Sequence, residues 1–546
     1  MPPDLRKKGM RRKAQSGALT PDEKKVFKRR RIIMTSTQGM ILAVIVIYLI
    51  AMVLIGVLFN SRGSGSSSNE FFIGGRKLGP LVTAMSAEAS DMSSYLLMGL
   101  PGLAYFAGIA EVGWTAIGLG IGTYLNWLLV ARLLRRYSDK IGAFTIPDFF
   151  SRRYGDKRHM LACIAALVII IFFVPYTASG FKAVGTLFNS LFGFNYHTAM
   201  IVGAVVIIGY TTLGGFLAVS TTDLIQSIFM TIALIAVVFF GINQAGGFDS
   251  VMNNAKSLPG YFDLFGGYDM ATNTGSHYGF LAIVSTIAWG LGYFGMPHIL
   301  LRFMAIRNEK ELVTSRRIAS VWVFLSMAIA VFIGIIGNAI SSEGIIPYLT
   351  TGSDAETIII KMADLMGSKG FFMILMAGII MAGILAATMS TADSQLLAAA
   401  SSVSQDLLQD FFGIKLSRKA SMRAARLTVI GIAVLAVFLA WNPNSSVFRV
   451  ISFAWAGFGA TFGPTMLIAL FWKRSNKQGA LAGMIAGAVM VFVWKYLIAP
   501  MGGAFAIYEL LPAFIIGLVV NVVVSLVTPE PDAKIVKTFE EVKANR

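Results

Sequence analysis

Long apolar runs recur along the whole chain, separated by short polar segments. Each run is close to the ~20 residues that a helix needs to cross a bilayer, and no polar stretch is long enough for a soluble domain. We therefore predict an all-α protein with thirteen membrane-spanning helices, near residues 40–59, 80–104, 112–134, 159–187, 197–215, 220–243, 279–300, 318–340, 371–400, 426–441, 447–472, 479–498 and 507–528.

The composition supports a polytopic membrane protein. Of the 546 residues, 56% are hydrophobic and only 14% are charged. The single cysteine, Cys163, lies in an apolar run, so neither a disulfide framework nor a cysteine metal site is expected. The four histidines are scattered and predict no metal cluster.

The distribution of Lys and Arg predicts the topology. The loops after odd-numbered runs, together with the C-terminal segment, hold 28 of these residues, whereas the alternate loops hold 3. Positive residues collect in cytoplasmic loops, so the odd loops and the tail 529–546 are predicted to be cytoplasmic. The net charge of +18 then reflects topology and not a nucleic-acid-binding face.

The N-terminal segment conflicts with this topology. Thirteen spans place the N-terminus outside, yet 12 Lys and Arg precede Met34 and should hold that end in the cytoplasm. Either the first helix does not span as drawn, or residues 1–33 are absent from the mature protein. We favour the second, because Met34 begins a short polar start that leads straight into the first run. Residues 1–36 are expected to form a basic disordered tail before a membrane domain at 37–528.

The second run is apolar at both ends but polar in its middle, where it carries Glu88, Ser90, Asp91, Ser93 and Ser94. Charges at bilayer depth are costly unless they face a cavity or a partner. Ser and Asp also compete for backbone hydrogen bonds and weaken a helix. We therefore predict two half-helices with an unwound joint. The alternative is an intact helix that packs a small polar face against its neighbours.

The seventh run is interrupted as well, by Gly290, Gly292, Gly295 and Pro297. The two interrupted helices lie five apart, so helices 2–6 (80–243) and helices 7–11 (279–472) are predicted to form two inverted repeats, followed by helices 12–13 (479–528). Interrupted helices at matching places in two halves indicate a transporter's binding site.

The motifs in and around these breaks resemble the sodium/solute symporter family, in particular its bacterial sodium/proline symporters. The resemblance covers roughly residues 40–527 and implies Na⁺-coupled uptake of L-proline across the plasma membrane by alternating access. The matching stretches are GGRKLGPLVTAMSAEASDMSSYLLMGLPG (74–102), GGFLAVSTTDLIQ (214–226), WGLGYFGMPHILLRFMA (289–305), ILAATMSTADSQLL (384–397) and FAWAGFGATFGPTMLIALFW (453–472).

The resemblance also implies a Na⁺ site, formed by backbone carbonyls of the second helix and by residues of the ninth. The implied ligands are Ala89, Met92, Ala387, Ser390 and Thr391. Positions 387, 390 and 391 share one face of a helix, and their oxygens suit a small hard cation. The alternative for the two hydroxyls is bonding to the preceding turn of their own helix.

Three charged residues resemble family positions that couple the ion to the solute, and Asp393 is a further candidate. Asp91 is expected to lower the cost of holding a cation. Asp223 is expected to open the sixth helix, where it could also act as an N-cap. Arg76 resembles an arginine tied to Na⁺ coupling, or is simply a cytoplasmic positive charge. Asp393 could complete a second Na⁺ site with Asp223, or be a carboxylate solvated in a vestibule.

The implied substrate pocket has aromatic walls and a half-helix N-terminus suited to a carboxylate. Its residues are Tyr176, Trp289, Tyr293, Pro297 and Ser93. The sequence departs from the proline-symporter pattern at Glu88, Ser94, Tyr95, Met296 and Asp393. Another small amino acid or compatible solute, or partial use of H⁺, is therefore the alternative.

Other classes fit less well. A sensor needs a soluble signalling domain, a channel needs a re-entrant filter, and an enzyme needs a nucleophile–base pair, a metal cluster or a phosphate loop. None of these is evident in the sequence. The expected partners are the small-molecule solute and the lipid bilayer, with no nucleic acid and no obligatory protein partner.

Overall fold

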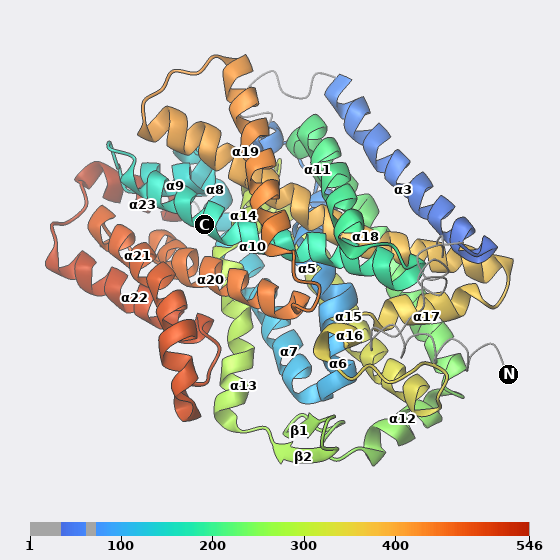
Figure 1. Cartoon of the computed structure of the whole chain (residues 1–546). Coiled ribbons are helices and arrows are strands. Elements are labelled where there is room, and N and C mark those ends of the chain that lie inside the picture. Colours follow the sequence, from blue (N-terminus) through green and yellow to red (C-terminus); the bar gives the residue numbers. More distant parts are fainter. Residues whose placement is uncertain (1–33, 62–71, 545–546) are drawn as a thin grey trace, which may run out of the picture.

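The computed structural model describes residues 34–61 and 72–544, and its elements are almost entirely helical (Figure 1). The predicted tail at 1–33 lies outside the described residues. The helices of the first half are α3 (Ser36–Ser61), η1 (Gly74–Arg76), α5 (Pro80–Ser94), η2 (Tyr95–Gly99), α6 (Leu100–Ala107), α7 (Ile109–Leu125), η3 (Asn126–Ala131), α8 (Arg132–Lys140), α9 (Ile146–Arg153), α10 (Met160–Phe192), α11 (Tyr196–Gln244) and α12 (Phe248–Ser257).

The second half begins with a short antiparallel hairpin, β1 (Gly266–Asp269) and β2 (Thr274–His277). The helices that follow are α13 (Phe280–Ile287), η4 (Ala288–Gly295), α14 (Pro297–Ala305), η5 (Glu309–Glu311), α15 (Leu312–Ser342), α16 (Gly352–Ala355), α17 (Ile358–Gly367), α18 (Phe371–Ser401), η6 (Ser402–Phe411), α19 (Arg418–Leu439), α20 (Val447–Phe471), α21 (Lys477–Val493), η7 (Trp494–Ile498), η8 (Ala499–Met501), η9 (Gly503–Phe505), α22 (Leu510–Val527) and α23 (Ala533–Ala544).

The breaks in the second and seventh helices are confirmed. The second helix leaves helical geometry at Ser93, which has φ 47° and ψ −166°. The seventh bends by 47° between η4 and α14, where Pro297 begins the second half. A further break, at Gly215 (φ 66°), divides α11 into the predicted fifth and sixth helices.

Every predicted apolar run corresponds to a helix, but the count of thirteen spans stays a prediction. Among the described residues, ten helices are long and apolar enough to cross a membrane, and eleven if the bent pair α13–η4 and α14 is counted as one. The N-terminal part of α11 (Tyr196–Gly209) is apolar but shorter than a membrane span.

The arrangement separates a buried centre from a lipid-facing periphery. The most apolar window of α20 is 89% buried, and those of α10 and α18 are 67% buried, whereas those of α3 and α19 are only 28% buried. Figure 1 shows α3 along one side of the molecule and α21 and α22 along the opposite side. The two broken helices run through the centre, so their polar residues are shielded from lipid.

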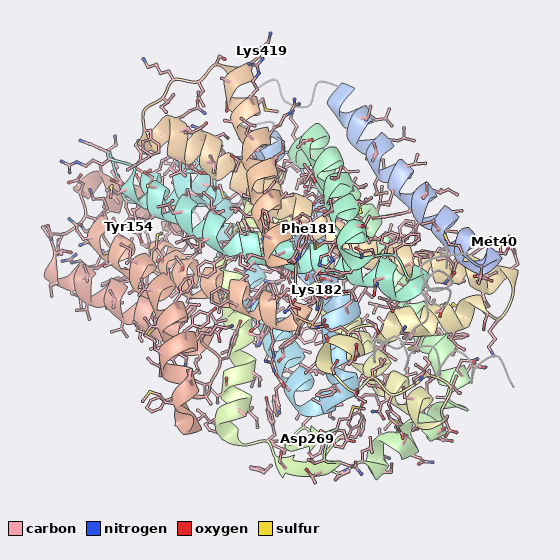
Figure 2. The ribbon with its side chains drawn as sticks, in the orientation of Figure 1. Met40, Tyr154, Phe181, Lys182, Asp269 and Lys419 are labelled. Atoms are coloured by element: carbon pink, nitrogen blue, oxygen red, sulfur yellow. The ribbon has the colours of Figure 1, made fainter. Side chains whose placement is uncertain are left out.

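A wide cavity of about 1330 Å³ leads toward this centre, with Glu111, Lys182, Phe448 and Arg449 among its lining residues. Figure 2 shows Phe181 and Lys182 of α10 in the middle of the molecule, between Asp269 of the hairpin and Lys419 of α19 at opposite ends. The Lys182 ammonium lies 3.5 Å from Glu356.

The C-terminal helix α23 was not predicted from the sequence. It packs against α8, where Arg136 donates to the Val542 carbonyl at 3.1 Å and Lys140 pairs with Glu541 at 2.9 Å. The ring of Phe539 lies 5.0 Å from the guanidinium carbon of Arg153, which is itself buried. This helix therefore ties the last segment of the chain to the end of the molecule that carries α8 and α9.

Candidate ion and substrate site at the two broken helices

Four of the five implied ion ligands lie together beside the break in α5. The Ser390 hydroxyl on α18 donates to the Ala89 carbonyl at 2.8 Å and lies 3.2 Å from the Ala387 carbonyl. The Thr391 hydroxyl lies 3.2 Å from the same Ala387 carbonyl. All four residues are buried. Carbonyl and hydroxyl oxygens are the donors that a hard cation prefers, so this cluster fits Na⁺ chemically.

Met92, the fifth implied ligand, immediately precedes the break. Its carbonyl accepts the backbone N–H of Tyr95, which follows the break. Its side chain lines a cavity with Asp91 and Trp289. Met92 thus lies between the ion-ligand cluster and the cavity beside Asp91.

Asp91 joins the two broken helices. Its carboxylate accepts the Tyr293 hydroxyl at 2.5 Å, and its backbone carbonyl accepts the Tyr176 hydroxyl at 3.2 Å. Only 5% of Asp91 is exposed. Two of the implied substrate residues therefore contact the residue implied to couple ion and solute.

The cavity next to Asp91 has mostly apolar walls and a volume of about 10 Å³, which is room for about one water molecule. It includes Tyr176 and Trp289 as expected. Sequence reasoning missed Leu119, Met327, Ile451 and Trp455, because single apolar residues in a membrane helix carry no local signal. Trp455 is the exception, since it lies in the quoted FAWAGFG motif; its indole donates to the Trp289 carbonyl at 2.8 Å. The lining residues are Asp91, Met92, Tyr95, Leu119, Tyr176, Trp289, Met327, Ile451 and Trp455.

The remaining implied substrate residues lie elsewhere. Ser93 lines a neighbouring cavity of about 10 Å³ together with Tyr176, Thr391 and Gln395. Tyr293 and Pro297 line neither cavity; Tyr293 contacts Asp91, and Pro297 begins α14.

Aromatic rings separate the Asp91 cavity from the wide one. Trp289 stacks with Tyr95 at 5.8 Å and with Tyr508 at 5.1 Å. Phe448, which lines the wide cavity, lies 5.3 Å from Trp289 and 5.8 Å from Tyr95. Access to the Asp91 cavity from this side therefore requires these rings to move.

The expectation that Asp223 opens a helix is wrong. The helical segment resumes after Gly215, so Asp223 lies about two turns inside it and cannot act as its N-cap. Its carboxylate is fully buried, accepts the Ser86 hydroxyl at 2.7 Å and pairs with Arg302 at 3.1 Å. Burial of such a charge requires a partner, and the guanidinium supplies it.

Asp393 is also fully buried, so the alternative of a solvated vestibule carboxylate is wrong. Its neighbour Ser394 accepts a hydrogen bond from Arg302 at 2.5 Å. Arg302 therefore lies between the helices that carry Asp223 and Asp393. Arg302 lies in the quoted WGLGYFGMPHILLRFMA motif, but a single arginine in an apolar segment carries no local signal of this role.

Arg76 forms contacts that a simple surface charge would lack. Its guanidinium donates to the carbonyls of Met304 at 2.6 Å and Ala143 at 2.7 Å, and it pairs with Asp139 at 3.4 Å. Burial, with Arg135 nearby, lowers the pKa of Arg76 to about 10. Arg76 thus links the segment before α5 to the ends of α8 and α14.

Two interrupted helices that cross at a buried carboxylate, beside an oxygen-rich cluster, define a secondary transporter of the broken-helix class. The sequence profile of the sodium:solute symporter family matches residues 71–487, and the chain belongs to this family. It is therefore a multi-pass membrane transporter and not an enzyme.

Similar proteins agree with this assignment. The chain is 42% identical over 502 residues to a sodium/proline symporter of Escherichia coli (strain K12), covering 91% of this chain and 95% of the relative. It is 39% identical over 506 residues, with the same coverage, to a sodium/proline symporter of Staphylococcus aureus (strain USA300). A solved Na⁺-coupled sialic acid symporter has the same fold, with TM-score 0.74, 17% identity, and coverage of 90% of this chain and 99% of that one.

Proposed function

We propose that this protein carries L-proline into the cell together with Na⁺. The observation that carries the proposal is the contact of Ser390 with the Ala89 carbonyl, next to an Asp91 carboxylate that binds Tyr293. This arrangement puts an oxygen-rich cluster and an aromatic cavity on the same broken helix. The relatives named sodium/proline symporters, at about 40% identity, supply the identity of the ion and the solute.

In the proposed ion site, Na⁺ is held by oxygens on both sides of one helix interface. The carbonyls of Ala89 and Met92 come from α5, and the oxygens of Ala387, Ser390 and Thr391 come from α18. Asp91 lowers the cost of the positive charge from one residue away. Because ion binding requires the two helices to stay together, it stabilises one arrangement of the transporter.

In the proposed substrate site, the proline ring lies among Tyr176, Trp289 and Tyr293. Ser93 lies at the break, and Pro297 starts the half-helix whose N-terminal end attracts the carboxylate. The cavity walls are aromatic and aliphatic apart from Asp91, which suits the chemistry of a compact solute with one apolar face. At about 10 Å³ the cavity must widen to admit this solute, by movement of the surrounding rings.

The proposed topology follows from charge. The end of the molecule with α8, α9 and α23 carries clustered Arg and Lys, so we assign it to the cytoplasm together with the C-terminus. The 1330 Å³ cavity then opens toward the outside. Alternating access would involve the inverted repeats at 80–243 and 279–472 within the membrane domain 37–528.

The proposal is tested by uptake of labelled proline into proteoliposomes under an inward Na⁺ gradient, with other solutes as competitors. Saturable Na⁺-dependent uptake, inhibited best by proline, supports it. A second candidate is another small amino acid or compatible solute, which Tyr95 favours because it contributes a phenol to the cavity wall. Stronger inhibition by such a solute would replace proline as the substrate, and uptake that is unaffected by Na⁺ would reject the proposal.

A further inference from the structure

One turn of the third helix contacts both broken helices. This turn, η3, is π-helical and joins α7 to α8. π-helical turns within α-helices frequently occur at functional sites. Its first two residues, Asn126 and Trp127, are buried.

Asn126 adds a hydrogen bond to the seventh helix at its break. Because η4 is a 3-10 helix, the Tyr293 carbonyl pairs with the N–H of residue 296 in its own helix, and Pro297 has no N–H to offer it. The Asn126 amide donates to this carbonyl at 2.9 Å. A carbonyl oxygen has two lone pairs, so this second hydrogen bond can hold Tyr293 in place relative to the third helix.

Trp127 holds the second helix in a similar way. Its indole N–H donates to Oε1 of Glu88 at 2.8 Å, and the Thr123 hydroxyl donates to the same oxygen at 3.1 Å. Glu88 is fully buried and directly precedes Ala89 in α5. The backbone at the ion-ligand cluster is therefore tied to the turn that also holds Tyr293.

Close packing makes this connection stiff. A Cβ atom on Gly122 would lie 2.3 Å from the Gly290 carbonyl oxygen, and one on Gly118 would lie 2.4 Å from that of Ile287. The backbones of α7 and the seventh helix thus touch directly just before η3. A displacement of α7 must then be shared by the seventh helix.

We propose that Asn126 and Trp127 are positioning residues that couple the ion site to the substrate site. An ion at the Ala89 carbonyl fixes α5, Glu88 passes this constraint to Trp127, and Asn126 passes it to Tyr293. The inference rests on the proposed function. The quantity that it concerns is the factor by which Na⁺ increases the affinity for proline. The direct contact of Tyr293 with Asp91 is a second connection, so removal of the η3 contacts should reduce the coupling and not abolish it.

The variants remove single hydrogen bonds. Asn126→Ala removes the donor to the Tyr293 carbonyl. Trp127→Phe removes the indole N–H but keeps a ring against Phe303, which lies 4.4 Å from Trp127. Trp322→Phe is the matched control, because it removes an indole bond of 2.9 Å to Thr231, between α15 and α11.

The measurement is binding of labelled proline to purified protein, with and without saturating Na⁺. The ratio of the two dissociation constants gives the coupling. We expect Asn126→Ala and Trp127→Phe each to reduce this ratio by about threefold to tenfold, as the loss of one hydrogen bond implies. Affinity without Na⁺ should change less than the ratio, and Trp322→Phe should keep the wild-type ratio.

A pair of changes at Glu88 separates coupling from folding. Glu88→Gln keeps an oxygen acceptor for both donors and should retain the coupling ratio, whereas Glu88→Ala should lose it to the same extent as Trp127→Phe. Wild-type ratios in Asn126→Ala and Trp127→Phe would overturn the inference and leave the proposed function intact. A wild-type protein whose proline affinity does not respond to Na⁺ would instead overturn the proposed function.

Discussion

Replacement of Ser390 by alanine removes one hydroxyl from the centre of the proposed ion site. In the structure this hydroxyl is fully buried and lies 2.8 Å from the Ala89 carbonyl and 3.2 Å from the Ala387 carbonyl. The variant loses an oxygen ligand when Na⁺ is bound. It also leaves the Ala89 carbonyl without its donor when Na⁺ is absent.

The expected magnitude follows from the buried position. In the ion-bound state the variant loses one oxygen contact to a charged group, which costs about 1.5–3 kcal/mol, and the unsatisfied Ala89 carbonyl of the Na⁺-free state offsets part of this cost. The Na⁺ concentration for half-maximal uptake should therefore rise by about 5-fold to 150-fold. At saturating Na⁺ the affinity for proline should stay close to that of the wild type, because linkage reaches proline only through ion occupancy.

The assay is proline uptake into proteoliposomes as a function of Na⁺ concentration. Ser401→Ala is the matched control, because Ser401 is a buried serine on the same helix. Within the described residues, its hydroxyl bonds only to its own preceding turn, at Ala398. The control should keep the wild-type Na⁺ dependence. If Ser390→Ala also keeps it, Ser390 is not an ion ligand and the site is assigned incorrectly.

Three further changes have defined outcomes. Asp91→Asn should insert and fold but lose most Na⁺-coupled uptake, and near-normal uptake at ordinary Na⁺ would contradict its role. Arg302→Gln leaves the Asp223 carboxylate buried without its guanidinium and should destabilise the fold by about 3–5 kcal/mol, with partial recovery in the double variant with Asp223→Asn; thermal unfolding of the purified proteins checks this. The Arg302 guanidinium already compensates the Asp223 carboxylate, so we expect no second Na⁺ there. Charge-to-substrate ratios measured in vesicles should give one Na⁺ per proline, and two would favour a second ion site. Phe539→Ala removes the ring over Arg153 and should lower the melting temperature, and an unchanged melting temperature would mean that α23 adds no stability.

The fold was largely predictable from the sequence because its signals are local. Apolar runs of spanning length predict the helices. Ser93 and Pro297 lie at breaks that the polar residues of the second run and the glycines of the seventh predict. The contact of Ser390 with Ala89 was implied by family motifs, since residues this far apart in the sequence share no local pattern. The elements that were missed have weak local signals, as in α23, which is short and amphipathic.

The missed site residues depend on contacts between distant helices. Arg302 is one arginine in an apolar segment, and only the fold shows that it pairs with Asp223. Asn126 gains its role from the Tyr293 carbonyl, which is far away in sequence. Asp223 lies close to the start of the sixth apolar run, at 220–243, which predicts a helix start there. The structure confines the break to Gly215 and the helix resumes at once, so Asp223 lies inside it.

The central claim is that Na⁺ and proline cross the membrane together through the broken-helix site. The most direct test is flux of radioactive Na⁺ into proteoliposomes driven only by an inward proline gradient, with equal Na⁺ on both sides. The account predicts Na⁺ entry above the level seen without proline, in a fixed ratio to proline entry, and its loss in Asp91→Asn. Proline entry without accompanying Na⁺ would contradict the account.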